Sequence, residues 1–372
     1  MPADSRPGDE PFAAGRRYSA YGSGPNGTKA VGTWGRSEGI MNDTSLVAVT
    51  GATGFLGSHL TERLVRDGHR VRILARDPAK AEALRGTVSG GIVLGDITDP
   101  SALAALVEGA DTVFHLVSNF RTASGPPSSY RAVNLQGTVT ALDAARAAGV
   151  RRFVHCSTIG VHGHVRATPG DERSPYAPGD LYQETKMQAE QACFAEARRG
   201  GMEIVIVRPC SIYGPGDLRM LKMFKMLRNG RFFLLGPCRE NFHAVYIDDL
   251  VEGFLLAMRT PDISGEAFII GGPEYLPLRE YLATAARAVG ARPPALRFPY
   301  APFYAAAAVC EAICVPLGLE PPLHRRRVRF FRNNRAFSIE KARAVLGYAP
   351  AVDLEEGMKR TVLWYRENGY LP

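Results

Sequence analysis

The chain of 372 residues is 45% hydrophobic, and 45 Lys+Arg against 37 Asp+Glu give it a formal net charge of +8. This length is sufficient for one large α/β domain with a smaller appended lobe. The positive surplus is spread along the chain, so we expect a phosphate-bearing ligand and no nucleic-acid partner. The most apolar stretch, residues 299–319, is interrupted by Pro302, Glu311 and Pro316, which excludes a bilayer-spanning helix there.

The six cysteines are scattered without a CxxC pair, and no secretory signal is recognisable. We therefore expect reduced thiols and a cytoplasmic location. Cys310 and Cys314 stand four residues apart in a predicted helix but have no His or Asp nearby, which favours packing over metal binding. No metal site is predicted.

Residues 1–42 are rich in Gly, Ser, Pro and Arg without hydrophobic periodicity, which predicts a disordered leader. From 43 to 210, strand-like and helical patterns alternate. The expected strands are 46–50, 70–75, 91–95, 112–117, 152–157 and 203–209. The expected helices are 57–67, 78–85, 101–108, 130–148 and 181–199. This alternation predicts a Rossmann-like, doubly wound parallel sheet.

Beyond residue 210 the alternation loosens, and Pro and Gly cluster at several points. We therefore expect residues 211–372 to form mainly a smaller mixed lobe that binds the substrate, with some elements returning to the first domain. Fold alone does not specify the substrate, so specificity is expected to come from this lobe.

The segment "TGATGFLG" places Gly51, Gly54 and Gly57 between a predicted strand and a predicted helix. Glycines there permit a sharp turn, a close approach of backbone to a pyrophosphate, and tight packing of helix on strand, while the helix N-terminus offers N–H groups to phosphates. The pattern favours a dinucleotide site over a ligand-free βα turn. Its predicted residues are Gly51, Thr53, Gly54, Phe55, Leu56 and Gly57.

The end of the second strand bears on the choice of cofactor. NAD sites usually carry an acid there, whereas an arginine suits the 2′-phosphate of NADP. Arg76 occupies this corner, which favours NADP, although Asp77 follows directly. After the third strand, Asp96 is expected to meet the adenine amino group and Ile97 to pack on the adenine ring.

Tyr182 and Lys186 stand four residues apart on a predicted helix, and therefore on one face of it. Asp180 and Gln183 have the spacing of an N-terminal capping pair. Taken alone, the Tyr–Lys spacing also fits two solvated surface residues. Upstream, "VHCSTIGVHG" ends a predicted strand with Ser157 and Thr158.

Together with "GDITD", "VFHLVS", "VNLQGT", "RPCSIYGPGD", "VYIDDL" and "KARAVLGYAP", these segments resemble, in order, the extended short-chain dehydrogenase/reductase family, including NAD(P)-dependent epimerase/dehydratases and enzymes like 3β-hydroxysteroid dehydrogenase and dihydroflavonol reductase. The resemblance implies Tyr182 as the general acid/base, Lys186 as the residue that holds the cofactor ribose and favours the tyrosinate, and Thr158, with Ser157 beside it, as the hydrogen-bond partner of the substrate oxygen. It also implies a homodimer. The residues implied to line the nicotinamide are Leu116, Val117, Ser118 and Pro209.

The chain also departs from the family pattern. Val117 and Ser118 replace two frequent alanines, and His162 replaces a frequent tyrosine, where packing is favoured over substrate contact. No Asp-Glu pair follows Thr158, which disfavours dehydration. Asn134 is expected to bend its helix rather than take part in chemistry.

Two segments bear on the substrate. The apolar stretch 299–319 fits either a wall against a sterol-, terpenoid- or flavonoid-like molecule or an ordinary buried or dimer-facing helix. The segment "HRRRVRFFRNNR" (324–335), which we expect to be a strand with one buried face, fits a grip on phosphate, a contact with anionic lipid, or a solvated basic surface. Residues 299–335 are thus a candidate for peripheral membrane contact.

Three functions remain open: an NADP-linked oxidoreductase for a bulky apolar alcohol or ketone, a nucleotide-sugar epimerase, and a non-catalytic NADP-binding regulator.

Overall fold

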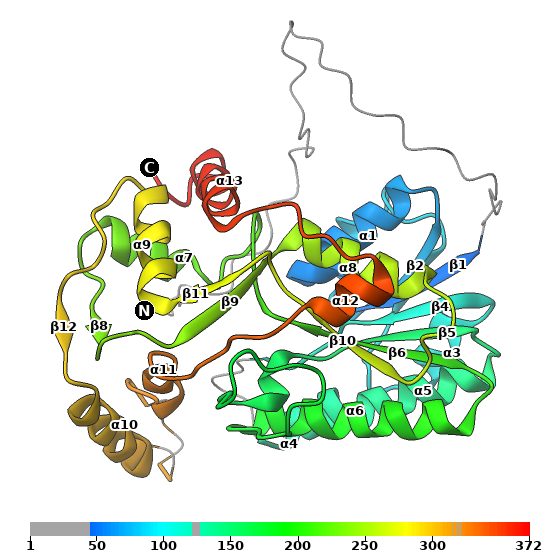
Figure 1. Cartoon of the computed structure of the whole chain (residues 1–372). Coiled ribbons are helices and arrows are strands. Elements are labelled where there is room, and N and C mark those ends of the chain that lie inside the picture. Colours follow the sequence, from blue (N-terminus) through cyan, green and yellow to red (C-terminus); the bar gives the residue numbers. More distant parts are fainter. Residues whose placement is uncertain (1–44, 121–126, 315, 318, 320) are drawn as a thin grey trace, which may run out of the picture.

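The computed structural model describes residues 45–120 and 127–372, apart from 315, 318 and 320. The predicted leader, residues 1–42, lies outside the described residues. The described chain forms a large sheet domain joined to a smaller lobe (Figure 1).

A seven-stranded sheet in the order β10-β6-β5-β4-β1-β2-β3 forms the centre of the large domain, and every neighbouring pair of its strands is parallel. Its strands are β1 (Leu46–Thr50), β2 (Arg70–Ala75), β3 (Gly91–Leu94), β4 (Ala110–His115), β5 (Arg152–Cys156), β6 (Glu203–Pro209) and β10 (Glu266–Ile270). Strand order reverses between β1 and β4, and in such sheets this is where the carboxyl ends of the strands open a ligand crevice.

Helices cover both faces of this sheet (Figure 1). One face carries α1 (Phe55–Arg66), α8 (Ile247–Arg259) and α12 (Glu340–Leu346), and the other carries α3 (Pro100–Val107), α5 (Gly137–Ala147) and α6 (Leu181–Arg199). Alternate residues of the strands enter separate apolar cores: in β1, Val47 and Val49 belong to one and Leu46 and Ala48 to the other. The Rossmann-like prediction is confirmed.

The expected strands and helices of this domain are present with small shifts at their ends; the short α2 (Pro78–Glu82) follows β2. The expected helix 130–148 differs, because α4 (Pro127–Tyr130), a π-helical segment η1 (Arg131–Gln136) and α5 follow one another. Asn134 lies in the π-helical segment, fully buried, and its Nδ2 donates to Thr185 Oγ1 at 3.0 Å. This buried contact is consistent with a structural role for Asn134.

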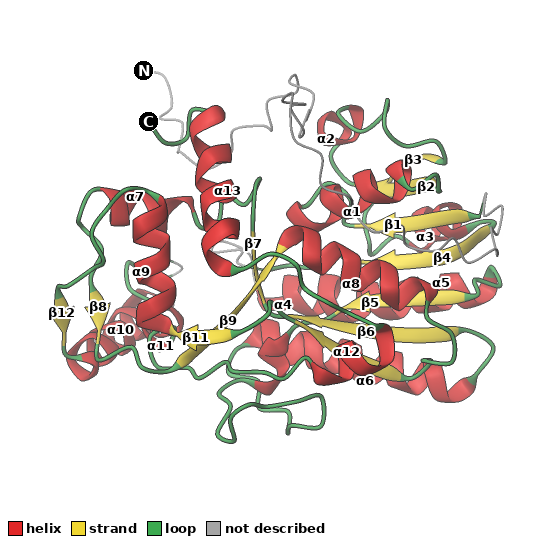
Figure 2. Cartoon of the chain, turned by 45° about the horizontal axis from the view of Figure 1, so that its top comes forward, coloured by secondary structure: helices red, strands yellow, loops and turns green. Residues whose placement is uncertain are grey.

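The smaller lobe contains a mixed sheet, in which β9 (Asn241–Tyr246) pairs with β7 (Ser211–Tyr213) and β11 (Tyr275–Pro277). A two-stranded sheet joins β8 (Leu234–Leu235) to β12 (Arg297–Phe298). Figure 2 shows α7 (Leu221–Arg228), α9 (Leu278–Ala288) and α13 (Leu354–Glu367) around this lobe. Residues after 210 also complete the large domain, since β10 pairs with β6 and α8 covers the sheet.

The strand expected within 324–335 is wrong. Residues Arg325–Arg329 form the short helix α11, in which Val328 is buried and the arginines are exposed. Val328 and Phe331, three residues apart, pack into one small apolar cluster, so helical spacing decides this segment.

The preceding apolar stretch forms α10 (Tyr300–Cys314), and Ala307 is its one buried residue among those described. Val309 and Ile313 are 58% and 57% exposed. The expectation that this helix is buried within the chain is therefore wrong. No helix in the described part of the chain is long and apolar enough to cross a bilayer.

Candidate active site

The glycine turn between β1 and α1 has room for backbone only. Gly51 has φ +75°, and a Cβ at this position would lie 2.7 Å from the Val117 nitrogen. A Cβ at Gly57 would lie 2.0 Å from the Gly51 oxygen. Gly54 begins α1 as its N-cap without a side-chain cap, so the first N–H groups of α1 remain available to phosphate oxygens at the carboxyl end of β1. These residues fit a dinucleotide.

The other predicted residues of this turn differ in their surroundings. Leu56 is buried in the apolar core, whereas Thr53 and Phe55 are half-buried. The Phe55 ring lies 5.2 Å from the guanidinium carbon of Arg219. The Leu56 side chain therefore packs beneath the turn, while its backbone N–H belongs to the first turn of α1.

At the ends of β2 and β3, Arg76 is 81% exposed, and its Nη1 lies 3.8 Å from Asp96 Oδ2. The neighbouring Asp77 is the N-cap of α2, where its Oδ1 accepts from the Ala79 nitrogen at 2.9 Å. The Asp77 carboxylate is therefore occupied in capping α2. Arg76 is the exposed charged side chain at the end of β2. Ile97 is 4% exposed and packs toward Gly137, so it offers little surface to an adenine ring.

The segment after β4 contacts both the glycine turn and the start of α6. The Leu116 nitrogen donates to the Thr50 oxygen at 3.2 Å, and Val117 lies against Gly51. Ser118 is exposed and forms a side-chain hydrogen bond with Tyr182. Leu116, Val117 and Ser118 thus lie between the turn and Tyr182. Pro209 is buried at the carboxyl end of β6.

A capping box fixes the start of α6. Asp180 Oδ1 accepts from the Gln183 nitrogen at 2.9 Å, and Gln183 Oε1 accepts from the Gly179 nitrogen at 2.6 Å. The predicted capping pair is confirmed. It places Tyr182 in the first turn of α6 and Lys186 in the second, on the side that faces the sheet.

The Tyr182 ring packs edge-on against Phe120 at 4.7 Å between centroids, and the Arg326 guanidinium carbon lies 5.9 Å from it. Burial raises the pKa of Tyr182 above its usual range, while the Ser118 hydrogen bond and the charge of Arg326 act in the opposite direction. The phenol is therefore protonated at neutral pH and can act as a proton donor.

Lys186 is 1% exposed, and its Nζ lies 3.4 Å from His155 Nε2. Burial lowers the pKa of Lys186. The His155 ring stacks on His115 at 5.5 Å, and His115 hydrogen-bonds to Thr50 and Thr138. Sequence reasoning missed both histidines; the available signal was a histidine that directly follows two apolar residues in each strand.

The two hydroxyls after β5 diverge. Ser157 Oγ donates to buried Glu190 Oε1. Thr158 Oγ1 accepts from the Gly160 nitrogen at 3.0 Å, and a Cβ at Gly160 would lie 3.2 Å from Gln183 Cγ in the first turn of α6. Thr158 is therefore the hydroxyl held beside the start of α6, and Ser157 belongs to an inner charge cluster.

That cluster centres on a buried ion pair. Arg208 Nη2 lies 2.7 Å from Glu190 Oε2, and these side chains are 2% and 0% exposed. Tyr176 donates to Glu190 at 2.8 Å, and His162 Nε2 lies 3.2 Å from Arg208 Nη1. His162 is thus packed away from the crevice, as favoured above.

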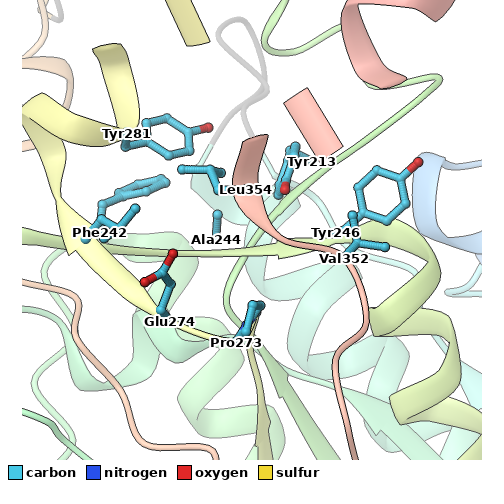
Figure 3. A pocket seen from close by; sticks show the side chains of 11 residues that line it. Tyr213, Phe242, Ala244, Tyr246, Pro273, Glu274, Tyr281, Val352 and Leu354 are labelled. Carbon is cyan, nitrogen blue, oxygen red and sulfur yellow. The ribbon is translucent and has the colours of Figure 1, made fainter. Parts of the chain in front are cut away.

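A small cavity of about 20 Å³ lies in the smaller lobe. Figure 3 shows Tyr213, Phe242, Tyr246 and Tyr281 around it, with Glu274 at one side. Neither Tyr182 nor Lys186 lines it, so this cavity is separate from the crevice.

A glycine turn at the point where strand order reverses, beside a Tyr–Lys helix and a strand-end hydroxyl, defines a nicotinamide-dependent enzyme of the short-chain dehydrogenase/reductase class. The chain belongs to the NAD dependent epimerase/dehydratase family, whose model matches residues 47–271. The resemblance, the enzyme class and the nicotinamide cofactor are confirmed.

The chain is 34% identical to the 2-alkyl-3-oxoalkanoate reductase of Stenotrophomonas maltophilia over 330 residues, covering 84% of this chain and 97% of the relative. It is 33% identical to a 3 beta-hydroxysteroid dehydrogenase/Delta 5-->4-isomerase of Mycobacterium tuberculosis, covering 87% and 93%. The solved dTDP-glucose 4,6-dehydratase DesIV of Streptomyces venezuelae, with NAD and TYD bound, is 27% identical, with a TM-score of 0.70 and coverage of 88% and 98%.

Proposed function

We propose that the protein is an NADP-dependent oxidoreductase that interconverts a secondary alcohol and a ketone on a bulky apolar molecule. Relatives named as a hydroxysteroid dehydrogenase and an oxoalkanoate reductase support this substrate class. The observation that carries the proposal is the placement of Tyr182 and Lys186 on successive turns of α6, with the Gly51–Val117 contact nearby along the same edge of the sheet.

In the proposed site, the glycine turn and the start of α1 hold the pyrophosphate, and Arg76 holds the 2′-phosphate. The bound nicotinamide supplies or accepts the hydride. Tyr182 gives its phenolic proton to the carbonyl oxygen during reduction and takes it back during oxidation. Thr158 donates a hydrogen bond to the same oxygen and so orients it. Lys186 carries the positive charge that favours the tyrosinate.

The test is Tyr182→Phe with NADPH and a panel of ketosteroids, flavanonols and nucleotide sugars. We expect wild-type protein to change the nicotinamide absorbance with an apolar ketone, and the variant to bind NADPH while its turnover falls by about 10²–10⁴, the usual contribution of a positioned proton donor. Conversion of a nucleotide sugar without net absorbance change would identify an epimerase. NADPH binding without turnover of any substrate would favour a regulator.

The NADP preference is tested by Arg76→Asp. Wild-type protein should bind NADPH more tightly than NADH, because a guanidinium pairs with the 2′-phosphate, and the variant should reverse this order. Arg85→Asp is the matched control, since Arg85 is an exposed arginine paired with Glu82 near the same edge. Equal wild-type affinities for the two cofactors would contradict the preference.

We further propose a cytoplasmic homodimer that pairs through α5 and α6, and peripheral membrane contact through 299–335. Light scattering measures whether the protein is a dimer.

The exposed apolar side chains of α10 support the membrane contact. Sedimentation with anionic vesicles measures this contact, and the double variant Val309→Asp with Ile313→Asp should no longer sediment. Failure of the wild-type protein to sediment with the vesicles would contradict the membrane contact.

A further inference from the structure

A buried imidazole lies directly beneath the catalytic lysine. His155 is 0% exposed on β5, and its Nε2 is 3.4 Å from Lys186 Nζ. Among the residues that the structure describes, His155 is the hydrogen-bond partner of this ammonium. An ammonium group has protons to donate but cannot accept, so the Nε2 lone pair is the acceptor.

This contact fixes the protonation of the ring. Burial, together with the charge of Lys186 and the neighbouring His115, lowers the pKa of His155 well below its usual value, so the ring is neutral at neutral pH. A neutral imidazole that accepts at Nε2 carries its proton on Nδ1. Nδ1 is buried and has no hydrogen-bond partner within the described residues. An unpaired buried donor costs stability, so apolar packing does not account for a histidine here.

The remaining groups around Lys186 are poor or indirect acceptors. Burial raises the pKa of Cys156 on β5 to about 11, and burial also raises the pKa of Cys193 on α6, so both thiols are protonated. Glu190 is engaged by Arg208. On β4, His115 is neutral and already hydrogen-bonds to two threonines. Tyr182, one turn earlier on α6, is protonated.

We propose that His155 is a positioning residue for catalysis: its Nε2 holds the Lys186 ammonium in place below the crevice and keeps it charged in buried surroundings. This inference rests on the proposed function, in which Lys186 must be charged. An acceptor stabilises the ammonium and opposes the desolvation that favours the neutral amine. The stacked, neutral His115 ring fixes His155 from the other side.

The test compares His155→Phe, which keeps a flat ring and removes the acceptor, with His155→Gln, which keeps a neutral acceptor at similar reach. NADPH dissociation constants are measured by fluorescence from pH 6 to 10, with kcat and KM alongside. In the Phe variant, the pH above which NADPH affinity declines should move down by about one unit, which is a tenfold change in the proton affinity of Lys186. The Gln variant should restore the wild-type profile. The Phe variant should also lose kcat more than it raises KM for the substrate.

His243→Phe is the matched control. His243 is another buried histidine, but its Nε2 contacts Gly272 O in the smaller lobe. It should alter stability without moving the pH profile. If His155→Phe does not fold, His155→Met supplies the apolar replacement.

Profiles for the Phe or Met variant that coincide with wild type would overturn the role of His155, whereas absence of NADPH binding by the wild-type protein would instead overturn the proposed function.

Discussion

Acid should destabilise this protein through its buried histidines, and His115 gives the clearest case. Its side chain is fully buried, with Nδ1 3.2 Å from Thr50 Oγ1 and Nε2 3.0 Å from Thr138 Oγ1. Burial and the charge of Lys186 lower the pKa of His115 to about 3. The unfolded chain therefore binds a proton near pH 6.5 that the folded chain refuses until about pH 3.

The direction of the pH dependence of stability follows from this difference in pKa. Between these two values the unfolded state holds more protons, so stability falls as the pH falls below 6.5 and is unaffected by this group above it. Each pH unit costs about 1.4 kcal/mol, and at pH 5 the loss from His115 is about 2 kcal/mol. A domain of ordinary stability has about 5–15 kcal/mol in total.

The assay is urea unfolding followed by circular dichroism at pH 8, 6.5, 5.5 and 5. His115→Gln should be less stable than wild type at pH 8, because its threonine contacts change, but its stability should fall less steeply below pH 6.5, by about 1.4 kcal/mol per unit. His164→Gln, at an exposed position where Nδ1 accepts from the Asn334 nitrogen, is the control for removal of a histidine outside the core. An unchanged slope in His115→Gln would refute the reasoning.

Three further substitutions test the packing of the site. Gly57→Ala should abolish NADPH binding or folding, because a Cβ at this position has no space. Gly86→Ala is the control: a Cβ at Gly86 faces open space, so this variant should bind NADPH like wild type. Equal NADPH binding by both variants would contradict the role of the glycine turn. Glu190→Gln leaves Arg208 buried without its counter-charge and should cost about 3–5 kcal/mol in urea unfolding; a loss below about 1 kcal/mol would be inconsistent with a buried pair. Asp180→Ala removes the α6 cap and should lower stability by about 1 kcal/mol, an effect that Asp180→Asn should largely reverse.

Local pattern predicted most of the large domain, since strand runs, helical periods and the glycine turn each depend on neighbouring residues. The capping box of α6 is such a case, because Asp180 and Gln183 are close in sequence. The same reasoning located Tyr182 and Lys186 on one helix face.

The buried side-chain contacts next to the site join residues that are distant in sequence, so local pattern could not predict them. His155 meets Lys186, and Ser157 meets Glu190, because β5 and the residue after it lie against α6, which is distant in sequence. Short segments were also ambiguous. In "VRFF" the apolar and charged residues alternate as in a strand, but Val328 and Phe331 pack together against α10, which requires helical spacing.

The position of β10 has a consequence for how the polypeptide can be divided. Glu266–Ile270 supplies the outermost strand of the main sheet, beside β6, although residues 210–265 separate the two in sequence. A fragment ending at residue 210 would leave β6 as a bare edge with apolar side chains on both faces, a surface prone to pairing with other chains. The sheet domain therefore depends on a strand that comes after the smaller lobe in sequence, and the two parts should not be exchanged between relatives at residue 210.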